Sequence, residues 1–215
     1  MGYVPRAQKT GRPPVTSRAE ILAAARKLID QDGWEKLTVR RLAAELGIGA
    51  TTLYHHVRDK QDLLILLLNA YAEQLPRPRL PADPRERVIA AATAMHDALA
   101  AWPWAAQILT SDGFVGLLDE PSLHLVEAIL AGARDAGCTP ARSVDVFRSI
   151  WYFTVGEILV RSHATGKPRR EIDFGRFDPE RLPHLADVGG RWRQLATRGI
   201  YEEGLRSFVA GLLPE

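Results

Sequence analysis

Residues 38–60 read TVRRLAAELGIGATTLYHHVRDK, and this stretch decides the fold. Its first part places apolar residues at helical spacing behind Thr38, a residue type that caps helix N-termini. Gly47 follows where a tight turn between two helices needs a positive φ. The second part, about Ala50 to Val57, is too short and too polar for a core helix. The pattern therefore predicts a helix-turn-helix, whose second helix is suited to a DNA major groove.

The second helix has an inward and an outward side. Leu53 and Val57 lie four residues apart and are expected to face inward. The outward set is then Gly49, Ala50, Thr51, Thr52, Tyr54, His55 and His56. Their hydroxyls and imidazoles can reach phosphates or base edges. Arg40, near the start of the preceding helix, suits guanine O6 and N7, and Lys60 suits a phosphate.

The charge of the chain is unevenly spread. The 215 residues carry a formal net charge of +2. Residues 1–60 hold eleven Lys and Arg against six Asp and Glu, whereas residues 61–215 hold seventeen against twenty. A basic amino-terminal part on a mildly acidic body favours binding of a polyanion, and a solvated charged surface is the alternative.

The rest of the chain predicts an all-α fold of about nine or ten helices. Ser17 and Glu20 form a capping-box pattern, and Gly33 ends the first helix. Prolines at 84, 103, 121 and 140 fall near first turns. Further helices are expected at 59–75, 84–101, 103–110, 120–136, 140–165 and 199–212, with short ones near 179–188 and 191–197. We expect a flexible basic arm (1–16), a helix-turn-helix DNA-binding domain (17–62) and a ligand-binding and dimerisation domain (63–215). The arm is either an inert tail or a further DNA contact.

The sequence gives no support for a disulfide-bonded, membrane-spanning, secreted or enzymatic protein. Cys138 is the only cysteine, so no internal disulfide forms, which fits a cytoplasmic protein. No apolar run reaches the length of a membrane span, and the amino terminus lacks a signal core. No P-loop, HExxH or GxSxG motif occurs, so we expect neither an enzyme nor a cofactor. The adjacent His55 and His56 point about 100° apart on a helix, so no metal site is predicted.

The middle of the chain is rich in aromatic and histidine side chains. The candidate ligand-binding residues are Met95, His96, Trp102, Trp104, Phe114, His124, Phe147 and Trp151. One interpretation is simple core packing. The other is an apolar cavity with a few polar anchors, as small-molecule sites are built. His96, on an otherwise apolar face, fits either interpretation.

The order of these motifs resembles the tetracycline-repressor family of bacterial regulators. The pattern T-x-R-x-L-A-x-x-L-G-[IV] followed by T-L-Y-x-H-V-x-x-K matches from Thr38 to Lys60, and YFTVG (152–156) and YEEGL (201–205) match near the carboxyl end. The resemblance implies a ligand-responsive repressor that leaves a palindromic double-stranded DNA operator when a small-molecule effector binds. It also implies that Thr38, Tyr54, His56 and Lys60 lie near phosphates, and that Arg40, Ala50, Thr51 and His55 face bases.

The resemblance also implies a homodimer. Family members build a four-helix interface from the helices expected here at 140–165 and 199–212. An apolar face on the second helix suits that role: Ile200, Leu205, Phe208, Val209 and Leu212. Packing within one subunit is the alternative, and each face is expected to do some of both. Tetracycline repressors hold a magnesium–drug chelate through a histidine, and residues 105–111 have none, so a more apolar effector is expected. The competing hypotheses are a helical ligand-binding protein without DNA function and an all-α enzyme.

Overall fold

The computed structural model describes residues 16–111, 113–164 and 177–214. All regular elements in these ranges are helices, which confirms the all-α prediction. The chain divides into two compact units, unit 1 (Met1–Tyr71) and unit 2 (Ala72–Glu215). The division falls inside one helix, whereas the sequence placed the boundary after residue 62. The predicted arm lies almost wholly outside the described residues.

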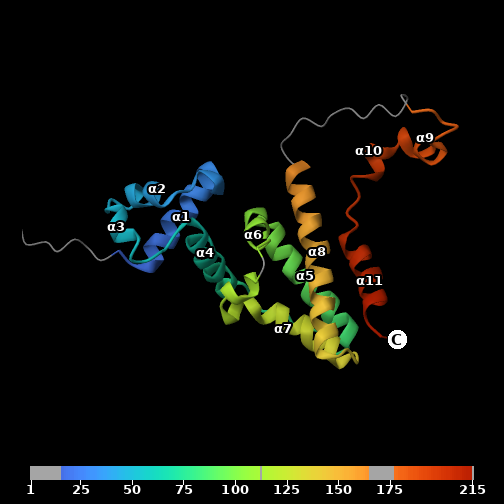
Figure 1. Cartoon of the computed structure of the whole chain (residues 1–215), viewed down its shortest axis with the longest axis horizontal. Helices are drawn as coiled ribbons and strands as arrows, with labels where there is room; N and C mark the ends of the chain where they lie inside the picture. The colour runs from blue at the N-terminus through green and yellow to red at the C-terminus, as the bar shows by residue number, and fades with distance from the viewer. Residues whose placement is uncertain (1–15, 112, 165–176, 215) are drawn as a thin grey trace, which may run out of the picture. The chain divides into compact units, whose positions relative to one another are not determined.

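Unit 1 is a small helical bundle (Figure 1). Its elements are α1 (Arg18–Asp32), the 3₁₀ turn η1 (Trp34–Lys36), α2 (Val39–Glu45), α3 (Ala50–Leu53) and α4 (Lys60–Gln74). The capping box at the start of α1 is present, because the Ser17 backbone N–H donates to Glu20 at 2.7 Å and Glu20 N–H donates to the Ser17 hydroxyl at 3.2 Å. The Ser17 backbone bond, followed by its hydroxyl bond, lowers the pKa of the Glu20 carboxyl. Gly33, at φ 85°, ends α1.

The core of unit 1 is aliphatic and holds the short helices in place. Its most deeply buried side chains are Ile21, Ala25, Leu37, Leu42, Ala43, Leu53, Val57, Leu63, Leu64 and Leu67. Two ion pairs, Lys27 with Glu45 at 2.6 Å and Arg41 with Asp32, join α2 to α1 on the outside. A helix as short as α3 is not stable alone, so its conformation depends on this packing.

Unit 2 contains the remaining elements. They are α5 (Pro84–Ala100), α6 (Pro103–Ile108), η2 (Phe114–Leu117), α7 (Glu120–Asp135), α8 (Pro140–Ala164), α9 (Pro183–Gly189), α10 (Trp192–Leu195) and α11 (Tyr201–Leu212). Each helix expected from the sequence in this unit is present, with ends shifted by a few residues. No helix in the described ranges is long and apolar enough to cross a membrane.

Helices α5, α7, α8 and α11 form the packed centre of unit 2. A Cβ atom on Gly132 of α7 would lie 2.7 Å from Val88 Cγ2 and 2.9 Å from the Pro84 carbonyl oxygen, so α5 and α7 meet at van der Waals distance there. Helix α11 lies beside α5 and α8 (Figure 1). The end of α11 is fixed by Arg142, which donates to the Leu212 carbonyl at 2.9 Å, and by Arg85, which donates to the Pro214 carbonyl.

Candidate nucleic-acid interface and effector domain

The helix-turn-helix is built by local signals that the sequence contains. The Thr38 hydroxyl accepts a hydrogen bond from the Arg41 N–H at 3.1 Å and so caps α2. Because it accepts there, its own proton stays available to a phosphate oxygen. Gly47 has φ 66°, as the tight turn requires. Arg40, in the first turn of α2, is exposed.

Helix α3 is shorter than the sequence predicted. Its α-helical part ends at Leu53, whereas we expected it to reach Val57. The His55 N–H donates to Thr52 O at 3.2 Å and the His56 N–H to Leu53 O at 2.9 Å, so the last turn tightens to i→i+3 bonds. Tightening at a helix end is common, since the terminal carbonyls lack α-helical partners. The backbone nevertheless continues as a helical turn to Val57.

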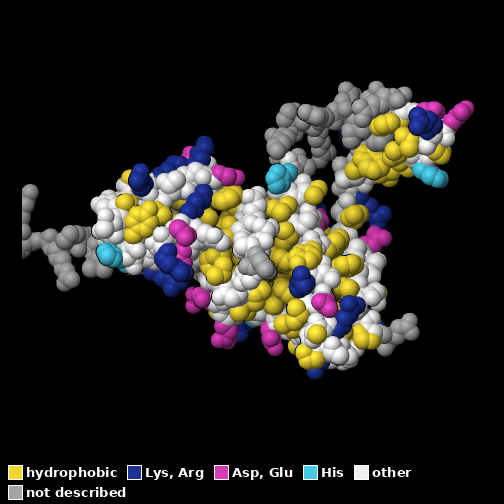
Figure 2. Space-filling view, viewed as in Figure 1, with side chains coloured by type: hydrophobic (Ala, Val, Ile, Leu, Met, Phe, Trp, Pro, Cys, Tyr) yellow, Lys and Arg dark blue, Asp and Glu magenta, His cyan; other side chains and the backbone are white. Residues whose placement is uncertain are grey.

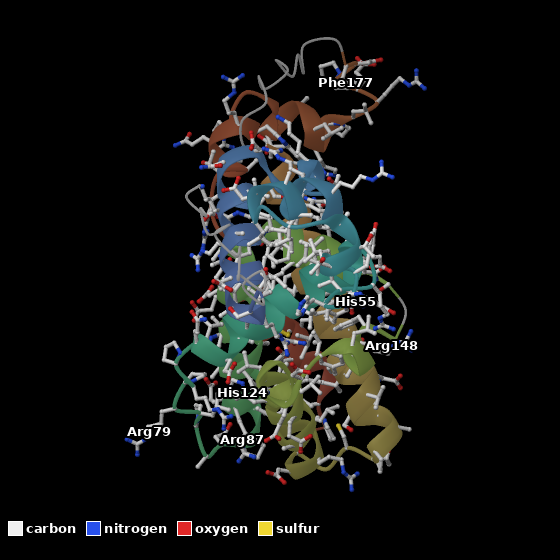
Figure 3. All side chains as sticks on the ribbon, turned by 90° about the vertical axis from the view of Figure 1, so that its left-hand side faces the viewer. His55, Arg79, Arg87, His124, Arg148 and Phe177 are labelled. Carbon is white, nitrogen blue, oxygen red and sulfur yellow. The ribbon has the colours of Figure 1, made fainter. Side chains whose placement is uncertain are left out.

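The two sides of α3 and the following turn differ sharply in burial. Leu53 is 0% exposed and Val57 2%, whereas Tyr54 is 52% exposed. Among the other residues of this segment that are predicted to contact DNA, Ala50 is half-buried and four are exposed: Thr51, Thr52, His55 and His56. Lys and Arg side chains lie on the same unit, and His55 projects from its surface (Figures 2 and 3). Unit 1 therefore presents polar and aromatic groups on a helix that an aliphatic core holds from behind.

The Lys60 ammonium has two partners within unit 1. Its Nζ donates to the Glu35 carbonyl oxygen at 2.9 Å and lies 4.9 Å from the centroid of the Trp34 ring. Partial burial lowers the pKa of Lys60, and the nearby Glu35 charge acts in the opposite direction. Trp34 was not among the residues predicted from the sequence, because nothing local links it to a residue 26 positions later.

The candidate effector residues fall into separate groups in unit 2. Trp151 of α8 stacks on Phe114 of η2, with centroids 4.6 Å apart, and on Phe147, at 6.4 Å. Met95 and Trp104 are buried, and Trp102 is half-buried at the start of α6. The three stacked rings pack against one another and are buried.

His96 belongs to a polar cluster that the sequence did not reveal. Its Nε2 lies 2.9 Å from Glu157 Oε2 and its Nδ1 3.0 Å from Asp97 Oδ1. Its ring stacks on Tyr201, with centroids 3.8 Å apart. The Tyr201 hydroxyl donates to the Ala92 carbonyl at 3.3 Å, so the Thr154 hydroxyl, at 2.7 Å, donates to Tyr201. This arrangement matches a satisfied core histidine.

His124, at the start of α7, is only partly satisfied. Its Nδ1 lies 3.3 Å from the Pro121 carbonyl oxygen, whereas its Nε2 is buried without a hydrogen-bond partner among the described residues. A buried nitrogen of this kind is a candidate polar anchor for a bound molecule. The described ranges contain no group of three or more His, Cys, Asp or Glu placed to hold a metal ion.

An exposed apolar stripe runs along α8. Val144, Tyr152 and Val160 are 47%, 61% and 71% exposed, and Arg148 and Gly156 lie between them at four-residue spacing. Arg148 projects outward from α8 (Figure 3), and its guanidinium lies over the Tyr152 ring and donates to the Tyr152 hydroxyl at 3.0 Å. Hydrophobic side chains are visible over α8 and α11 in Figure 2.

The apolar residues of α11 and its N-cap divide between packing within the subunit and an outward side. Leu205 and Val209 are 0% and 1% exposed and pack inside unit 2, whereas Ile200 and Phe208 are 60% and 38% exposed. Leu212 is half-buried. Helix α11 thus packs one side against its own subunit and leaves Ile200 and Phe208 on the other.

Comparison with known proteins covers both units. The model of bacterial regulatory proteins of the tetR family matches residues 21–67, and the model of the tetracyclin repressor-like C-terminal domain matches residues 77–214. An HTH-type transcriptional regulator of Saccharopolyspora erythraea is 34% identical over 93% of this chain and 85% of its own length. The class A tetracycline repressor protein from transposon 1721 of Escherichia coli is 33% identical over 89% and 88%. The crystal structure of BioQ with its double-stranded DNA operator has a TM-score of 0.65 at 23% identity, covers 92% of this chain and 98% of that one, and shares the fold.

Proposed function

The chain belongs to the tetR family of bacterial regulatory proteins, and from that premise we propose that it is a ligand-responsive repressor that binds an operator as a homodimer. One observation supports this proposal above the others. The surface of α3 and its following turn exposes Thr51, Thr52, Tyr54, His55 and His56, while Leu53 and Val57 fix it from behind. Exposed groups of this kind on a rigidly held short helix are what reading a major groove requires.

The roles of individual residues on the DNA follow from their chemistry. Arg40 is exposed at the start of α2 and suits a guanine. The hydroxyls of Thr38 and Tyr54 suit phosphate oxygens, which fix register without reading sequence. His55 suits a base edge and His56 a phosphate, and Ala50 and Thr51 are small enough to let the backbone approach the bases.

A second copy of the chain is the partner proposed for the α8 stripe. Val144, Tyr152 and Val160 are exposed in the single subunit. Burying side chains of this kind is favourable by about 1.5–3 kcal/mol each, so a partner helix that covers them would stabilise a dimer. Gly156 lies among them, with nothing within 4 Å of the place where a Cβ would be. A mid-helix glycine without a neighbour in its own subunit suits the close approach of a helix from the partner.

The effector is proposed to bind in unit 2, near the stacked Phe114, Phe147 and Trp151. Aromatic side chains, and the His124 Nε2 that has no hydrogen-bond partner in the described part of the chain, suit a flat, mainly apolar molecule with at least one hydrogen-bonding group. Helix α4 runs from unit 1 into unit 2, so it is the covalent route by which binding alters DNA affinity. The effector changes operator binding only to the extent that its affinity differs between the DNA-binding and the DNA-releasing conformation, typically by ~1–3 kcal/mol.

Two alternatives remain as hypotheses to be separated by experiment. One is a helical ligand-binding protein that never touches DNA, and the other is an all-α enzyme. Membership of a family of regulators favours neither. We propose that the chain is not an enzyme, that it needs no cofactor, and that it acts in the cytoplasm, where its operator would be.

The test is the binding of fluorescently labelled DNA from the region flanking its own gene, followed by anisotropy. We expect saturable binding that is at least 1,000-fold tighter than binding to a scrambled duplex of the same length. Equal affinity for both duplexes would refute the proposal. A small-molecule library, screened by thermal shift, then supplies compounds whose addition should release the DNA.

A further inference from the structure

Lys60 and Trp34 form a contact within unit 1 that joins two helices of the DNA-binding unit through a turn. Lys60 is the first residue of α4, and Trp34 opens the η1 turn that precedes α2. The Lys60 ammonium lies over the Trp34 ring at 4.9 Å and donates to the next carbonyl, that of Glu35, at 2.9 Å. Both contacts reach the same turn, so they act together as one attachment, which we call the Lys60–Trp34 clamp.

The turn that the clamp holds is itself rigid. The Leu37 N–H donates to the Trp34 carbonyl at 3.1 Å and closes the 3₁₀ turn, and the Leu37 side chain is only 1% exposed. Thr38, the cap of α2, is the next residue. A displacement of Trp34 is therefore passed directly to the start of α2.

The first turn of α4, on the other side of the clamp, is also fixed. The Asp62 N–H donates to Asp59 Oδ1 at 2.8 Å, and the Arg58 N–H donates to Asp62 Oδ2 at 2.9 Å. The Arg58 backbone bond lowers the pKa of the Asp62 carboxyl. Arg58 directly follows Val57, which anchors the end of the α3 turn in the core. The start of α4 is thus joined to α3 through the chain and to α2 through Lys60.

The surroundings of the ammonium favour an internal role. Lys60 is half-buried, its charge lies near the Glu35 carboxylate, and its Nζ contacts both the Trp34 ring and the Glu35 carbonyl oxygen. The other lysine of this turn, Lys36, is exposed instead.

We propose that Lys60 is a positioning residue of the DNA-binding unit, whose clamp on Trp34 makes α2 follow α4 when α4 moves. The proposal rests on the proposed function, because the movement of α4 matters only if it changes DNA affinity. Helix α3 follows α4 through the connecting chain, and α2 follows it through the clamp. Both helices of the motif then move as one body.

The test uses full-length Lys60→Met, Trp34→Leu, the double variant and a matched control, Lys36→Met, from the same turn. Operator affinity is measured between 50 and 200 mM salt. We expect Lys60→Met to weaken binding by about tenfold without changing the slope of log K against log[salt]. We expect the double variant to be no weaker than the weaker single variant, Lys60→Arg and Trp34→Phe to restore affinity, and Lys36→Met to behave as wild type.

A phosphate contact by Lys60 predicts a different salt dependence. Loss of a phosphate contact would reduce the slope by about 0.9 for each contact. A reduced slope for Lys60→Met, or additive losses in the double variant, would overturn the proposal while leaving the proposed function intact.

A measurement without DNA tests the Lys60–Trp34 clamp independently of the proposed function. Backbone hydrogen exchange over residues 34–41 should become faster in Lys60→Met and Trp34→Leu and stay unchanged in Lys36→Met. Unchanged exchange in all three variants would refute the clamp even if the wild-type protein failed to bind an operator.

Discussion

The imidazole of His96 lies 2.9 Å from the Glu157 carboxylate, from Nε2 to Oε2, and this contact joins α5 to α8. The His96 side chain is 12% exposed and that of Glu157 is 14% exposed, so both groups are largely removed from water. Arg161 donates to the second oxygen of Glu157 at 3.0 Å, and the Tyr201 ring covers one face of the imidazole. The cluster is therefore a polar link between three helices of unit 2.

Replacing His96 by Phe should destabilise unit 2. Phenylalanine keeps a ring against Tyr201 but leaves Glu157 Oε2 without its donor, and an unsatisfied buried acceptor costs about 1–3 kcal/mol. Urea unfolding followed by circular dichroism measures the loss. Combining His96→Phe with Glu157→Leu should recover part of it, because the second change removes the unpaired carboxylate. Strictly additive losses would show that the two side chains do not interact.

Tyr201 should give unit 2 an alkaline limit. Burial raises the pKa of its phenol from 10.0 to about 12. Since the folded state disfavours the phenolate, the stability contributed by the neutral phenol is complete below pH 10 and is lost as the pH rises toward 12. The loss across this window is on the order of 3 kcal/mol. Tyr201→Phe should lower stability at pH 7, through the lost bonds to Ala92 and Thr154, and should flatten the decline between pH 10 and 12. An unchanged decline would assign the alkaline sensitivity to another group.

Gly156→Leu should prevent dimerisation. The position is open in the single subunit, so a leucine there meets nothing within it, but it would hold apart two helices that approach closely. Sedimentation velocity at micromolar concentration should show a dimer for the wild type and a monomer for the variant. Gly116→Leu is the matched control, because Gly116 is equally open but lies in η2. A dimer that persists in Gly156→Leu would exclude the α8 stripe as the interface.

Gly132→Ala should strain the contact between α5 and α7. The added methyl would lie 2.7 Å from Val88 Cγ2 and 2.9 Å from the Pro84 carbonyl oxygen, and a backbone atom cannot turn aside. Overpacking of this kind typically costs 1–3 kcal/mol, enough to outweigh the roughly 1 kcal/mol that alanine gains over glycine in a helix. Thermal unfolding measures the difference. Gly211→Ala in α11, where the methyl meets nothing within 4 Å, should be neutral or stabilising.

Arg40→Ala should weaken operator binding and relax its specificity. If the guanidinium binds a guanine, its loss costs roughly 1–3 kcal/mol per half-site and affects the preference at one base pair. Competition with operators mutated one base pair at a time measures this preference. A uniform weakening on all duplexes, with a smaller salt slope, would assign Arg40 to a phosphate instead.

The helix-turn-helix was predictable because its determinants are local. Thr38 caps α2 through the N–H of Arg41, three residues away, and Gly47 adopts the positive φ that its turn requires. The Ser17–Glu20 capping box also acts over three residues. Even here the tightening of the last turn of α3 escaped the sequence, because it depends on where the core holds Leu53 and Val57.

The sequence by itself determined which segments are helical and that a short polar helix follows the glycine turn, because caps, turns and helical periods depend on residues within about four positions. Only the tertiary structure decided which side chains meet across helices. It paired Lys60 with Trp34, placed His96 against Glu157 61 residues away, and buried Leu205 and Val209 while leaving Ile200 and Phe208 exposed. These contacts depend on how helices cross, and the crossing follows from the packing of all side chains together.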